Sequence, residues 1–232
     1  MRILYLIPAR EGSKGLPGKN VKILNTKPLI SYSIDFALKN MSLGDELCIS
    51  TNDKQVIAIA KERTINIPFN RPGHLALDSS SSYDVLLHAL NHYKEKNEAF
   101  DAVLLLQPTS PFRSQTDFNN VITEFNDDCD MVVTVKESKA NPYFNLFEEN
   151  AYGFLEKSKK GDFERRQDCP PVYAFNGSIY LMRVTSLEKA KISEFKNVKK
   201  VVMPEERSID IDTMADWKLA EYFCHINLNE NS

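Results

Sequence analysis

Residues 3–20 read ILYLIPAREGSKGLPGKN, an apolar run followed by a loop rich in glycine and positive charge. The apolar run at 3–7 shows no alternation with polar residues, which is typical of a strand buried on both faces of a sheet. Apolar residues at three- and four-residue spacing predict a helix at 29–39. A strand, a glycine-rich loop and a helix in this order indicate an open α/β sheet, which binds its ligands at the carboxyl ends of its strands.

The alternation of strands and helices continues to residue 135. Further apolar runs predict strands at 46–50, 65–69, 102–106 and 131–135. Amphipathic stretches between them predict helices at 54–63, 83–94 and 117–125. Parallel strands joined by helices are covered on both sides, so we expect an α/β fold with a Rossmann-like, mostly parallel sheet and helices on both faces.

The regular pattern stops after Val135. Residues 136–166 are charged and predict only a short ribbon at 144–148 and 153–155. Strand character returns at 178–182 and 198–203, and a final helix is expected from 214 to about 225. We therefore expect a single domain over 1–232, with an inserted region at approximately 136–200 that forms a small arm.

Composition and charge exclude several classes of protein. Apolar residues make up 42% of the chain and charged residues 26%, which is typical of a soluble globular protein and not of a disordered one. The formal net charge of −3 gives no reason to expect nucleic acid or a membrane as partner. Without a long apolar run or a signal peptide, a cytoplasmic protein is expected.

The loop at 8–20 has the composition of a phosphate site. Its glycines let backbone N–H groups approach an anion, and Arg10, Lys14 and Lys19 supply the positive charge that binds a nucleoside triphosphate. Neither GxxxxGK[ST] nor GxGxxG occurs, which argues against kinase-type NTPases and dinucleotide dehydrogenases. On composition alone, a solvent-exposed basic turn is the alternative.

Asp210 and Asp212 form a second constellation near the other end of the chain. In extended backbone this spacing places both carboxylates on one side and the intervening isoleucines on the other. Two carboxylates beside a triphosphate would form a Mg²⁺ site. Asp212 could equally be the N-cap of the final helix, with Thr213 and Asp216 as alternative caps.

Several ordered blocks resemble the acylneuraminate cytidylyltransferases, the enzymes that make CMP-sialic acids. The blocks are IPAR-x-GSK with KN at 7–20, Arg71-Pro72 followed by Asp78 and its serines, LQPTSP-x-R at 106–113, NGSIY at 176–180 and SIDIDT at 208–213. Together they span nearly the whole chain. The resemblance implies a fold of the nucleotide-diphospho-sugar transferase type. It also implies transfer of CMP from CTP to the anomeric hydroxyl of a sialic acid, an N-acylneuraminate or a related nonulosonic acid, with release of pyrophosphate.

The resemblance also implies roles for individual residues. The metal ligands, for Mg²⁺ or Mn²⁺, are expected to be Asp210 and Asp212. The residues expected to act in catalysis are Arg10, Lys19 and Asp212. Those expected to bind the nucleotide are Pro8, Ala9, Arg10, Ser13, Lys14, Lys19, Asn20, Arg71, Ser80 and Ser82. Those expected to contact the sugar are Gln107, Arg166, Asn176 and Tyr180. The alternatives are a structural turn amide for Gln107, a solvated side chain for Arg166, and a helix N-cap for one of the serines.

Two positions depart from the family pattern on the sugar side. Ala174 stands where the N-acetylneuraminate enzymes tend to carry an arginine, and Phe144 replaces a lysine. A CMP-legionaminate or CMP-pseudaminate synthetase is therefore an open alternative. A cytidylyltransferase for an eight-carbon sugar acid is less favoured because the block at 208–212 favours the sialic acid branch. A non-catalytic nucleotide-binding module is disfavoured because the charged residues of the site are all present.

The inserted region is unusually aromatic for a charged arm. Its aromatic residues are Tyr143, Phe144, Phe147, Tyr152, Phe154 and Phe163. A small arm could hardly bury them against itself, and aromatic residues are favoured at the cores of interfaces. We expect a homodimer in which this region forms the contact and partly closes the partner's sugar pocket. A flap packed on its own domain is the alternative.

Overall fold

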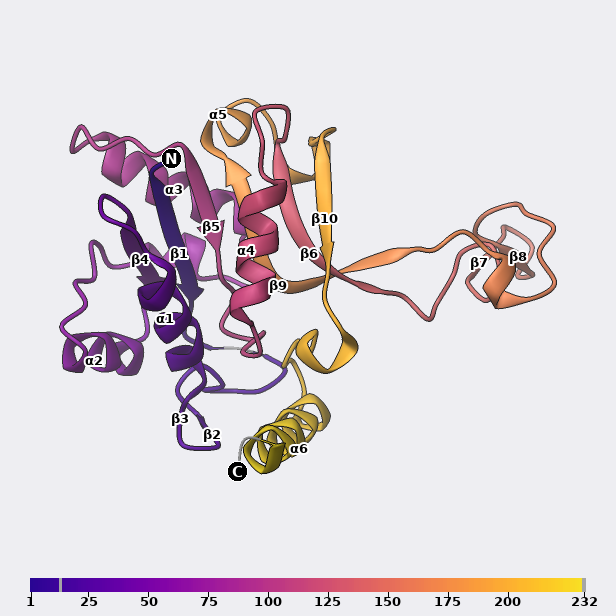
Figure 1. Ribbon diagram of the computed structural model, residues 1–232, viewed down its shortest axis with the longest axis horizontal. Coiled ribbons are helices and arrows are strands. Elements are labelled where there is room, and N and C mark those ends of the chain that lie inside the picture. The colour runs from indigo at the N-terminus through magenta and orange to yellow at the C-terminus, as the bar shows by residue number, and fades with distance from the viewer. Residues whose placement is uncertain (13, 231–232) are drawn as a thin grey trace.

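A six-stranded mixed sheet forms the centre of the computed structural model, which describes residues 1–12 and 14–230 (Figure 1). In sheet order β10-β6-β9-β5-β1-β4, the strands are β10 (Val198–Val202), β6 (Met131–Glu137), β9 (Tyr173–Arg183), β5 (Ala102–Leu105), β1 (Ile3–Ala9) and β4 (Glu46–Thr51). Strand β9 is antiparallel to its neighbours β5 and β6, and the other pairings in this sheet are parallel. The expected mostly parallel sheet is confirmed.

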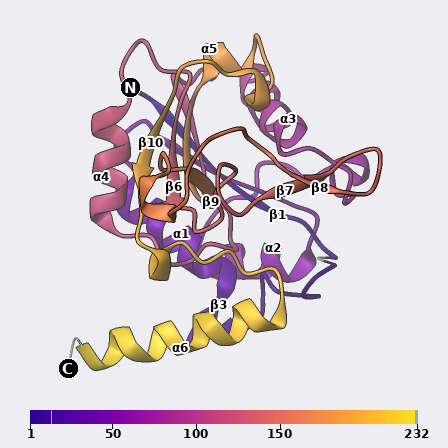
Figure 2. The same ribbon diagram turned by 90° about the vertical axis from the view of Figure 1, so that its right-hand side faces the viewer.

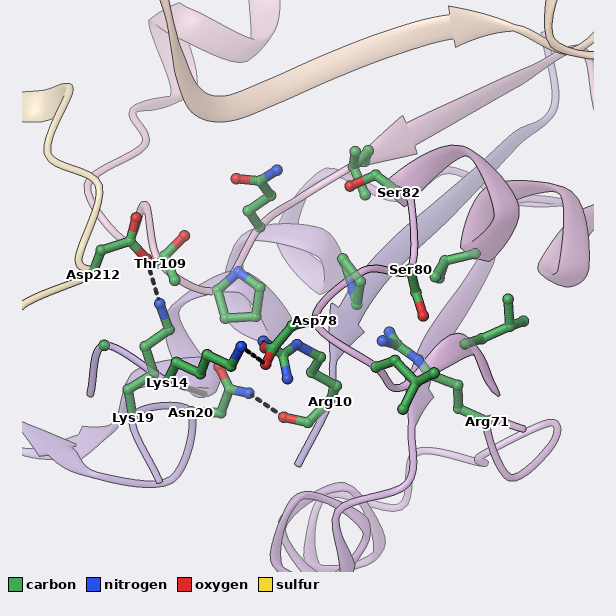
Figure 3. A pocket seen from close by; sticks show the side chains of 18 residues that line it. Arg10, Lys14, Lys19, Asn20, Arg71, Asp78, Ser80, Ser82, Thr109 and Asp212 are labelled. Carbon is green, nitrogen blue, oxygen red and sulfur yellow. Dashed lines mark hydrogen bonds and ion pairs between the residues drawn. The ribbon is translucent and has the colours of Figure 1, made fainter. Parts of the chain in front are cut away.

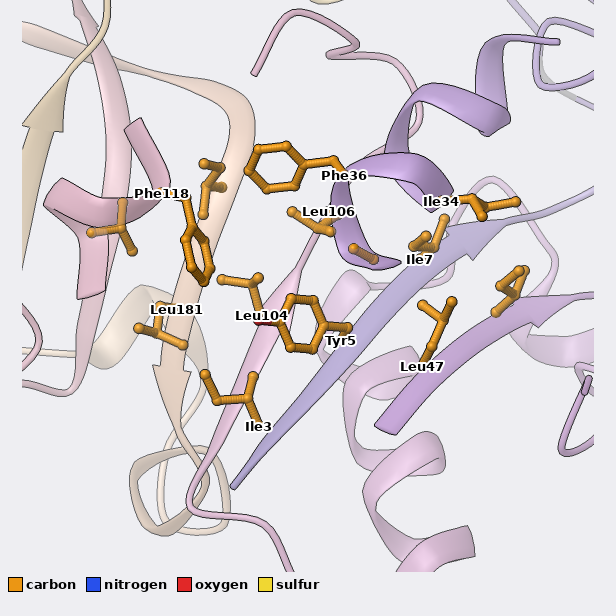
Figure 4. Close-up of a cluster of buried hydrophobic side chains, with 14 of the residues drawn as sticks. Ile3, Tyr5, Ile7, Ile34, Phe36, Leu47, Leu104, Leu106, Phe118 and Leu181 are labelled. Carbon is orange, nitrogen blue, oxygen red and sulfur yellow. The ribbon is translucent and has the colours of Figure 1, made fainter. Parts of the chain in front are cut away.

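Helices cover both faces of this sheet. On one face lie α1 (Leu29–Asn40), α2 (Lys54–Glu62) and α4 (Gln115–Glu124), and on the other lie α3 (Ser82–Lys94) and α5 (Val184–Leu187). Strand β1 shows why two layers form. Tyr5 and Ile7 pack into the cluster beneath α1 and α4 (Figure 4), whereas Leu4 and Leu6 pack into the cluster beneath α3. All four side chains are buried, so the apolar run at 3–7 is the doubly covered strand that the sequence predicts.

The chain ends in a long helix that packs on its beginning. Helix α6 (Met214–Glu230) lies beside the small hairpin of β2 (Ile23–Leu24) and β3 (Lys27–Pro28), as Figure 2 shows. Its Trp217 shares a buried cluster with Leu16 and with Ile211. This third cluster fixes the segment before α6 against the first loop of the chain. A membrane crossing would require a helix that is both long and apolar, and the described residues contain no such helix.

The strand expected at 65–69 is wrong. This segment is a loop, and an isolated bridge to Thr51 at the end of β4 forms at the next residue, Asn70. Pro68 removes one backbone donor from the run, which disfavours pairing with the edge of the sheet. Ile65 and Ile67 still pack against the core, which explains the apolar pattern that suggested a strand.

An arm leaves the sheet between β6 and β9 (Figure 1). It contains the hairpin of β7 (Phe147–Glu149) and β8 (Leu155–Lys157), together with the short helix η2 (Arg166–Asp168). Strands β9 and β10 fall within the inserted region expected at 136–200 but lie in the central sheet. The part of that region outside the central sheet and before β9 therefore corresponds to residues 138–172.

Candidate active site

A pocket of about 390 Å³ opens at the carboxyl ends of β1 and β5 (Figure 3). Its lining comes from the first loop (residues 8–20), Arg71, the segment 75–85, residues 105–109 and Asp212. The lining carries charges of both signs. The pocket therefore lies at the edge of the sheet where ligands of open α/β folds bind.

Glycines set the shape of the first loop. Gly12 and Gly18 have φ angles of 78° and 68°, a region that other residues rarely adopt. Gly15 is needed for a different reason, because a β-carbon at this position would lie 2.3 Å from the carbonyl oxygen of Asp212. The loop therefore packs directly on the segment 209–212, close to the other end of the chain.

Lys19 joins the first loop to the same segment. Its Nζ donates hydrogen bonds to Asp212 Oδ1 at 2.7 Å and to the carbonyl oxygen of Ile211 at 2.9 Å. Lys19 is 9% exposed, whereas the side chain of Asp212 is 68% exposed. The buried ammonium group thus places positive charge in the wall of the pocket, and most of the Asp212 carboxylate remains open to solvent.

The other two cations of the loop share one carboxylate. Asp78 forms ion pairs with Arg10 Nη2 and with Lys14 Nζ, the second at 2.7 Å. Arg10 also donates to the carbonyl oxygen of Gly12 at 2.9 Å. The hydrogen bond from Lys14, together with the charge of both cations, lowers the pKa of Asp78, so this group is an anion at neutral pH.

A buried arginine lies in the wall beyond these ion pairs. Arg71 donates from Nε to Ser50 Oγ at 3.0 Å and from Nη2 to the Ser50 carbonyl oxygen at 2.6 Å. Burial, and to a smaller extent the charge of Arg10, lowers the pKa of Arg71 to about 10, so it remains a cation at neutral pH. Asn20 supports the loop from the inside, because its Nδ2 donates to the carbonyl oxygen of Arg10 at 3.2 Å.

The serines before α3 have different roles, one as a helix cap and two in the wall of the pocket. Ser81 is the N-cap of α3, and its Oγ accepts a hydrogen bond from the Asp84 N–H at 3.1 Å. Ser80 and Ser82 on either side of it line the pocket (Figure 3). The Ser80 hydroxyl donates to the carbonyl oxygen of His74 at 2.7 Å. The capping alternative therefore applies to Ser81 and not to the two serines predicted to face the nucleotide.

Residues 107–109 continue from β5 into the pocket and are fixed from behind by Arg113. The Arg113 guanidinium donates from Nη2 to the Gln107 carbonyl oxygen at 2.6 Å, from Nε to the Ser178 carbonyl oxygen at 2.8 Å and from Nη1 to Ser33 Oγ at 3.0 Å. Burial lowers the pKa of Arg113 to about 9, so the group is still charged at neutral pH. One side chain thus fixes β5, β9 and α1 around the Gln107 backbone.

Gly177 brings a group of polar side chains together beside the pocket. Its φ is 73°, and a β-carbon there would lie 2.9 Å from Gln107 Oε1 and 3.4 Å from Asp210 Oδ2. Tyr180 belongs to the same group, because burial and the nearby charge of Asp210 both raise the pKa of its hydroxyl. Gln107, Tyr180 and Asp210 therefore gather at one place, next to the carboxylate of Asp212.

The aspartate pair has the alternation that its spacing predicts. The isoleucines at 209 and 211 are buried, and Asp210 and Asp212 are exposed. The surrounding protein desolvates the Asp210 carboxyl and raises its pKa; the charge of Asp212 adds to this shift, and a hydrogen bond with Thr109 opposes it. Although its carboxyl is partly desolvated, Asp210 retains contact with solvent.

Asp212 is not the N-cap of the final helix. Thr213 Oγ1 accepts from the Asp216 N–H at 3.3 Å, and Asp216 Oδ2 accepts from the Thr213 N–H at 2.7 Å. These reciprocal bonds form a capping box at the start of α6. The capping alternative for Asp212 is therefore wrong, and this carboxylate is available for the site.

Several residues predicted for the site lie elsewhere or outside the described chain. Asn176 is buried outside the lining of the pocket, and its amide group bonds to Thr134 Oγ1 and Ser208 Oγ. Arg166 lines a different cavity at the base of the arm. Ala9 is buried behind Pro8, which lines the pocket. Ser13 lies outside the described residues.

The polar residues at the site that were not predicted include Asp78 and Arg113. Asp78 and Arg113 both occur in the sequence blocks described above, but neither was assigned a role. An acidic residue directly before a serine run that faces a basic loop is a usable signal for an ion pair. The contacts of Arg113 join three separate segments of the chain, and nothing in the local pattern indicates them.

Comparisons with a family profile and with individual relatives point to the same family. The profile of the family described as Cytidylyltransferase matches residues 4–228. A CMP-N,N'-diacetyllegionaminic acid synthase of Legionella pneumophila is 34% identical over 228 residues, which cover 98% of each chain. An N-acylneuraminate cytidylyltransferase of Streptococcus agalactiae is 32% identical over 221 residues, which cover 94% of this chain and 52% of the relative.

A solved structure shares the fold. A CMP:2-keto-3-deoxy-manno-octonic acid synthetase in complex with CTP superimposes with a TM-score of 0.69, covering 98% of this chain and all of the other. The sequence identity is 18%, so this likeness bears on the fold alone. It confirms the expected α/β fold.

Proposed function

This chain belongs to the cytidylyltransferase family, and we propose that it transfers CMP from CTP to the anomeric hydroxyl of a nonulosonic acid and releases pyrophosphate. One observation carries this proposal. The pocket at the strand ends brings Arg10, Lys14 and Lys19 into one wall and the carboxylate of Asp212 beside them. Such a site offers positive charge to a triphosphate next to a position for a divalent cation.

The chain contributes mainly positioning and charge to this reaction. A new bond forms between the anomeric oxygen and the α-phosphorus as the hydroxyl releases its proton to solvent, and the bond from that phosphorus to the pyrophosphate breaks. Arg10, Lys14 and Lys19 offset the negative charge that grows on the departing pyrophosphate. Buried Arg71 and the serines at 80 and 82 form the wall for the nucleoside. Gln107 and Tyr180 orient the sugar hydroxyls, since an amide both donates and accepts hydrogen bonds.

Asp210 and Asp212 fit a Mg²⁺ or Mn²⁺ ion by the chemistry of their donors. Mg²⁺ prefers carboxylate, phosphate and water oxygens and usually binds few protein groups. Among the described side chains no three of His, Cys, Asp or Glu gather, and we propose that these two carboxylates are the ligands that the protein supplies. When bound, the ion neutralises phosphate charge and lowers the pKa of a coordinated hydroxyl.

The acceptor belongs to the nonulosonic acids, which include N-acylneuraminate and the legionaminic and pseudaminic types. The relative named for N,N'-diacetyllegionaminic acid matches over nearly the full length of both chains. Ala174 and Phe144 remove the positive charges that the resemblance expects on the sugar side. Both observations favour a legionaminic- or pseudaminic-type acceptor as the second candidate beside N-acylneuraminate.

A homodimer built by the arm is part of this proposed function. The arm exposes large apolar side chains: Phe147 (47% exposed), Tyr152 (85%), Phe154 (68%) and Leu155 (69%). Exposed apolar groups gathered on a projecting hairpin support contact with a second copy of the chain. Arg166, which lines no part of its own pocket, lies at the base of this arm and is a candidate to reach the partner's sugar.

Pyrophosphate release from purified protein tests the proposal. CTP, UTP, ATP and GTP are each supplied with N-acetylneuraminate, a legionaminic acid, a pseudaminic acid or an eight-carbon 2-keto acid, with Mg²⁺ present. We expect release only with CTP and a nine-carbon acid, and loss of release in Asp212→Asn. Equal rates with all four triphosphates, or exclusive use of the eight-carbon acid, would contradict the assignment.

Sedimentation tests the dimer separately. Tyr152→Glu combined with Phe154→Glu should give a monomer that still binds CTP but uses the sugar poorly, because the first loop is complete within one chain. Tyr222→Glu on the exposed face of α6 is the matched control. A wild-type monomer with full activity would contradict both the assembly and the shared site.

A further inference from the structure

Asp78 forms ion pairs with two of the cations that the proposed function assigns to the triphosphate. Its two carboxylate oxygens pair separately with Arg10 and Lys14 (Figure 3). The side chain of Lys14 is 80% exposed, so this pair is not fixed by burial. A phosphate that takes the N–H groups now bound by Asp78 must replace this carboxylate, and a phosphate on the remaining N–H groups of Arg10 and Lys14 would lie close to its negative charge.

The segment that carries Asp78 has room to withdraw. Asp78 lies in the loop between η1 (Gly73–Leu75) and α3, and the neighbouring Leu77 is exposed. A second cavity of about 480 Å³ lies on the other side of this loop, lined by His74, Asp84, His88 and Asn91 among others. Leu75 and Ser80 line both cavities, so this loop is the wall between them.

We propose that Asp78 is an exchangeable anion that alternates with the phosphates of the ligand on Arg10 and Lys14. The inference rests on the proposed function, because it takes the ligand to be CTP and the leaving group to be pyrophosphate. With CTP bound, the loop withdraws and the phosphates take both cations. After transfer, the Asp78 carboxylate returns and competes with pyrophosphate, which hastens its release.

The charge of Asp78 makes this role specific to the phosphates. The Asp78 carboxylate repels a triphosphate that lies close to it. Its two ion pairs also compete with the triphosphate for Arg10 and Lys14, which weakens the binding of the triphosphate to these cations. In the described part of the chain the Asp78 carboxylate forms no hydrogen bond with Gln107 or Tyr180, so binding of the sugar is not expected to depend on it. Asp78 is therefore a positioning residue that acts through Arg10 and Lys14.

The test compares Asp78→Asn with wild-type protein in calorimetric titrations with inorganic pyrophosphate and in steady-state kinetics. Asp78→Asn should bind pyrophosphate roughly three- to tenfold more tightly, the effect of losing one or two solvent-exposed ion pairs. The KM for CTP should fall, and kcat should fall or stay constant because pyrophosphate leaves more slowly. The KM for the sugar should not change. Asp78→Glu, which keeps the charge, should resemble wild type.

Asp84→Asn is the matched control, because it removes the same charge from the start of α3 without touching Arg10 or Lys14. Melting temperatures verify that each variant is folded. Unchanged or weaker pyrophosphate binding in Asp78→Asn, with normal wild-type turnover, overturns the inference and leaves the proposed function standing. A wild-type chain that binds neither CTP nor pyrophosphate overturns the proposed function, and this inference with it.

Discussion

Replacing Lys19 by methionine distinguishes its two contacts, one with a buried carbonyl oxygen and one with an exposed carboxylate. Methionine keeps the apolar volume of the lysine stem and removes only the ammonium group. Ile211 is fully buried, so its carbonyl oxygen would lose a charged donor without easy access to water. Hydrogen bonds to charged groups contribute about 1.5–3 kcal/mol, part of which offsets the burial of the ammonium itself.

The ion pair with Asp212 should contribute much less to stability. The carboxylate is 68% exposed, and pairs in contact with solvent contribute about 0–1 kcal/mol. We therefore expect Lys19→Met to lower the free energy of unfolding by about 2 kcal/mol and Asp212→Asn by less than about 1 kcal/mol. The double variant should resemble Lys19→Met, because the coupling between the two side chains is small.

Urea denaturation of the wild type, both single variants and the double variant measures these changes in the free energy of unfolding. The order of the variants should differ in kinetics, because the proposed function assigns both the Lys19 ammonium and the Asp212 carboxylate to the bound CTP. Lys19→Met should lower kcat/KM for CTP by roughly 10- to 100-fold, which corresponds to one or two steps of about 1.4 kcal/mol. Equal losses of stability in Lys19→Met and Asp212→Asn would refute the reasoning, since the exposed pair would then be the dominant contact.

Three further predictions follow from the contacts of the site. Asp210→Asn and Asp212→Asn should each lower turnover by at least about 100-fold while the fold persists, and full activity of the wild type in chelator would contradict the metal assignment. Asp210→Asn should also raise the melting temperature at neutral pH. The folded pKa of Asp210 is raised above its unfolded value, so the ionised carboxylate destabilises the fold above that pKa. The difference from wild type should vanish as the pH falls below it, and a difference that is constant with pH would contradict this cause. Arg113→Met should lower the free energy of unfolding by about 2–4 kcal/mol in denaturant titrations, because three acceptors lose a charged donor, and an unchanged stability would show that these acceptors find other partners.

Local sequence patterns predict the fold well where one segment carries its own signal. The strand at 3–7 and the helices at 29–39 and 54–63 agree with the structure to within a few residues, because burial on two faces and amphipathic spacing are properties of the segment itself. The segment 65–69 shows the limit. Its apolar residues are only half-buried against the core, and whether they pair in a sheet depends on the partner strand and on Pro68.

For the candidate site, too, the local sequence indicates some residues and not others. Glycine and charge lie together in the sequence around Arg10, Lys14 and Lys19, and the structure places all three in the lining of one pocket. Asn176 was expected to contact the sugar, but its amide group bonds to Thr134 and Ser208. The sequence does not distinguish an asparagine in a buried hydrogen-bond network from one that binds a ligand. The pairing of Asp78 with Arg10 joins positions 68 residues apart, and only the folded chain brings them together.

The close approach of Gly15 to the Asp212 carbonyl oxygen sets the order in which a newly synthesised chain folds and becomes active. Synthesis proceeds from the N-terminus, so the first loop leaves the ribosome long before residues 211 and 212, which hold its lysine. All strands of the central sheet are present once Val202 has emerged, yet at that moment Lys19 has neither of its two acceptors. A nascent chain is therefore expected to become folded before it becomes able to bind CTP, and activity appears only when Trp217 has docked against Leu16.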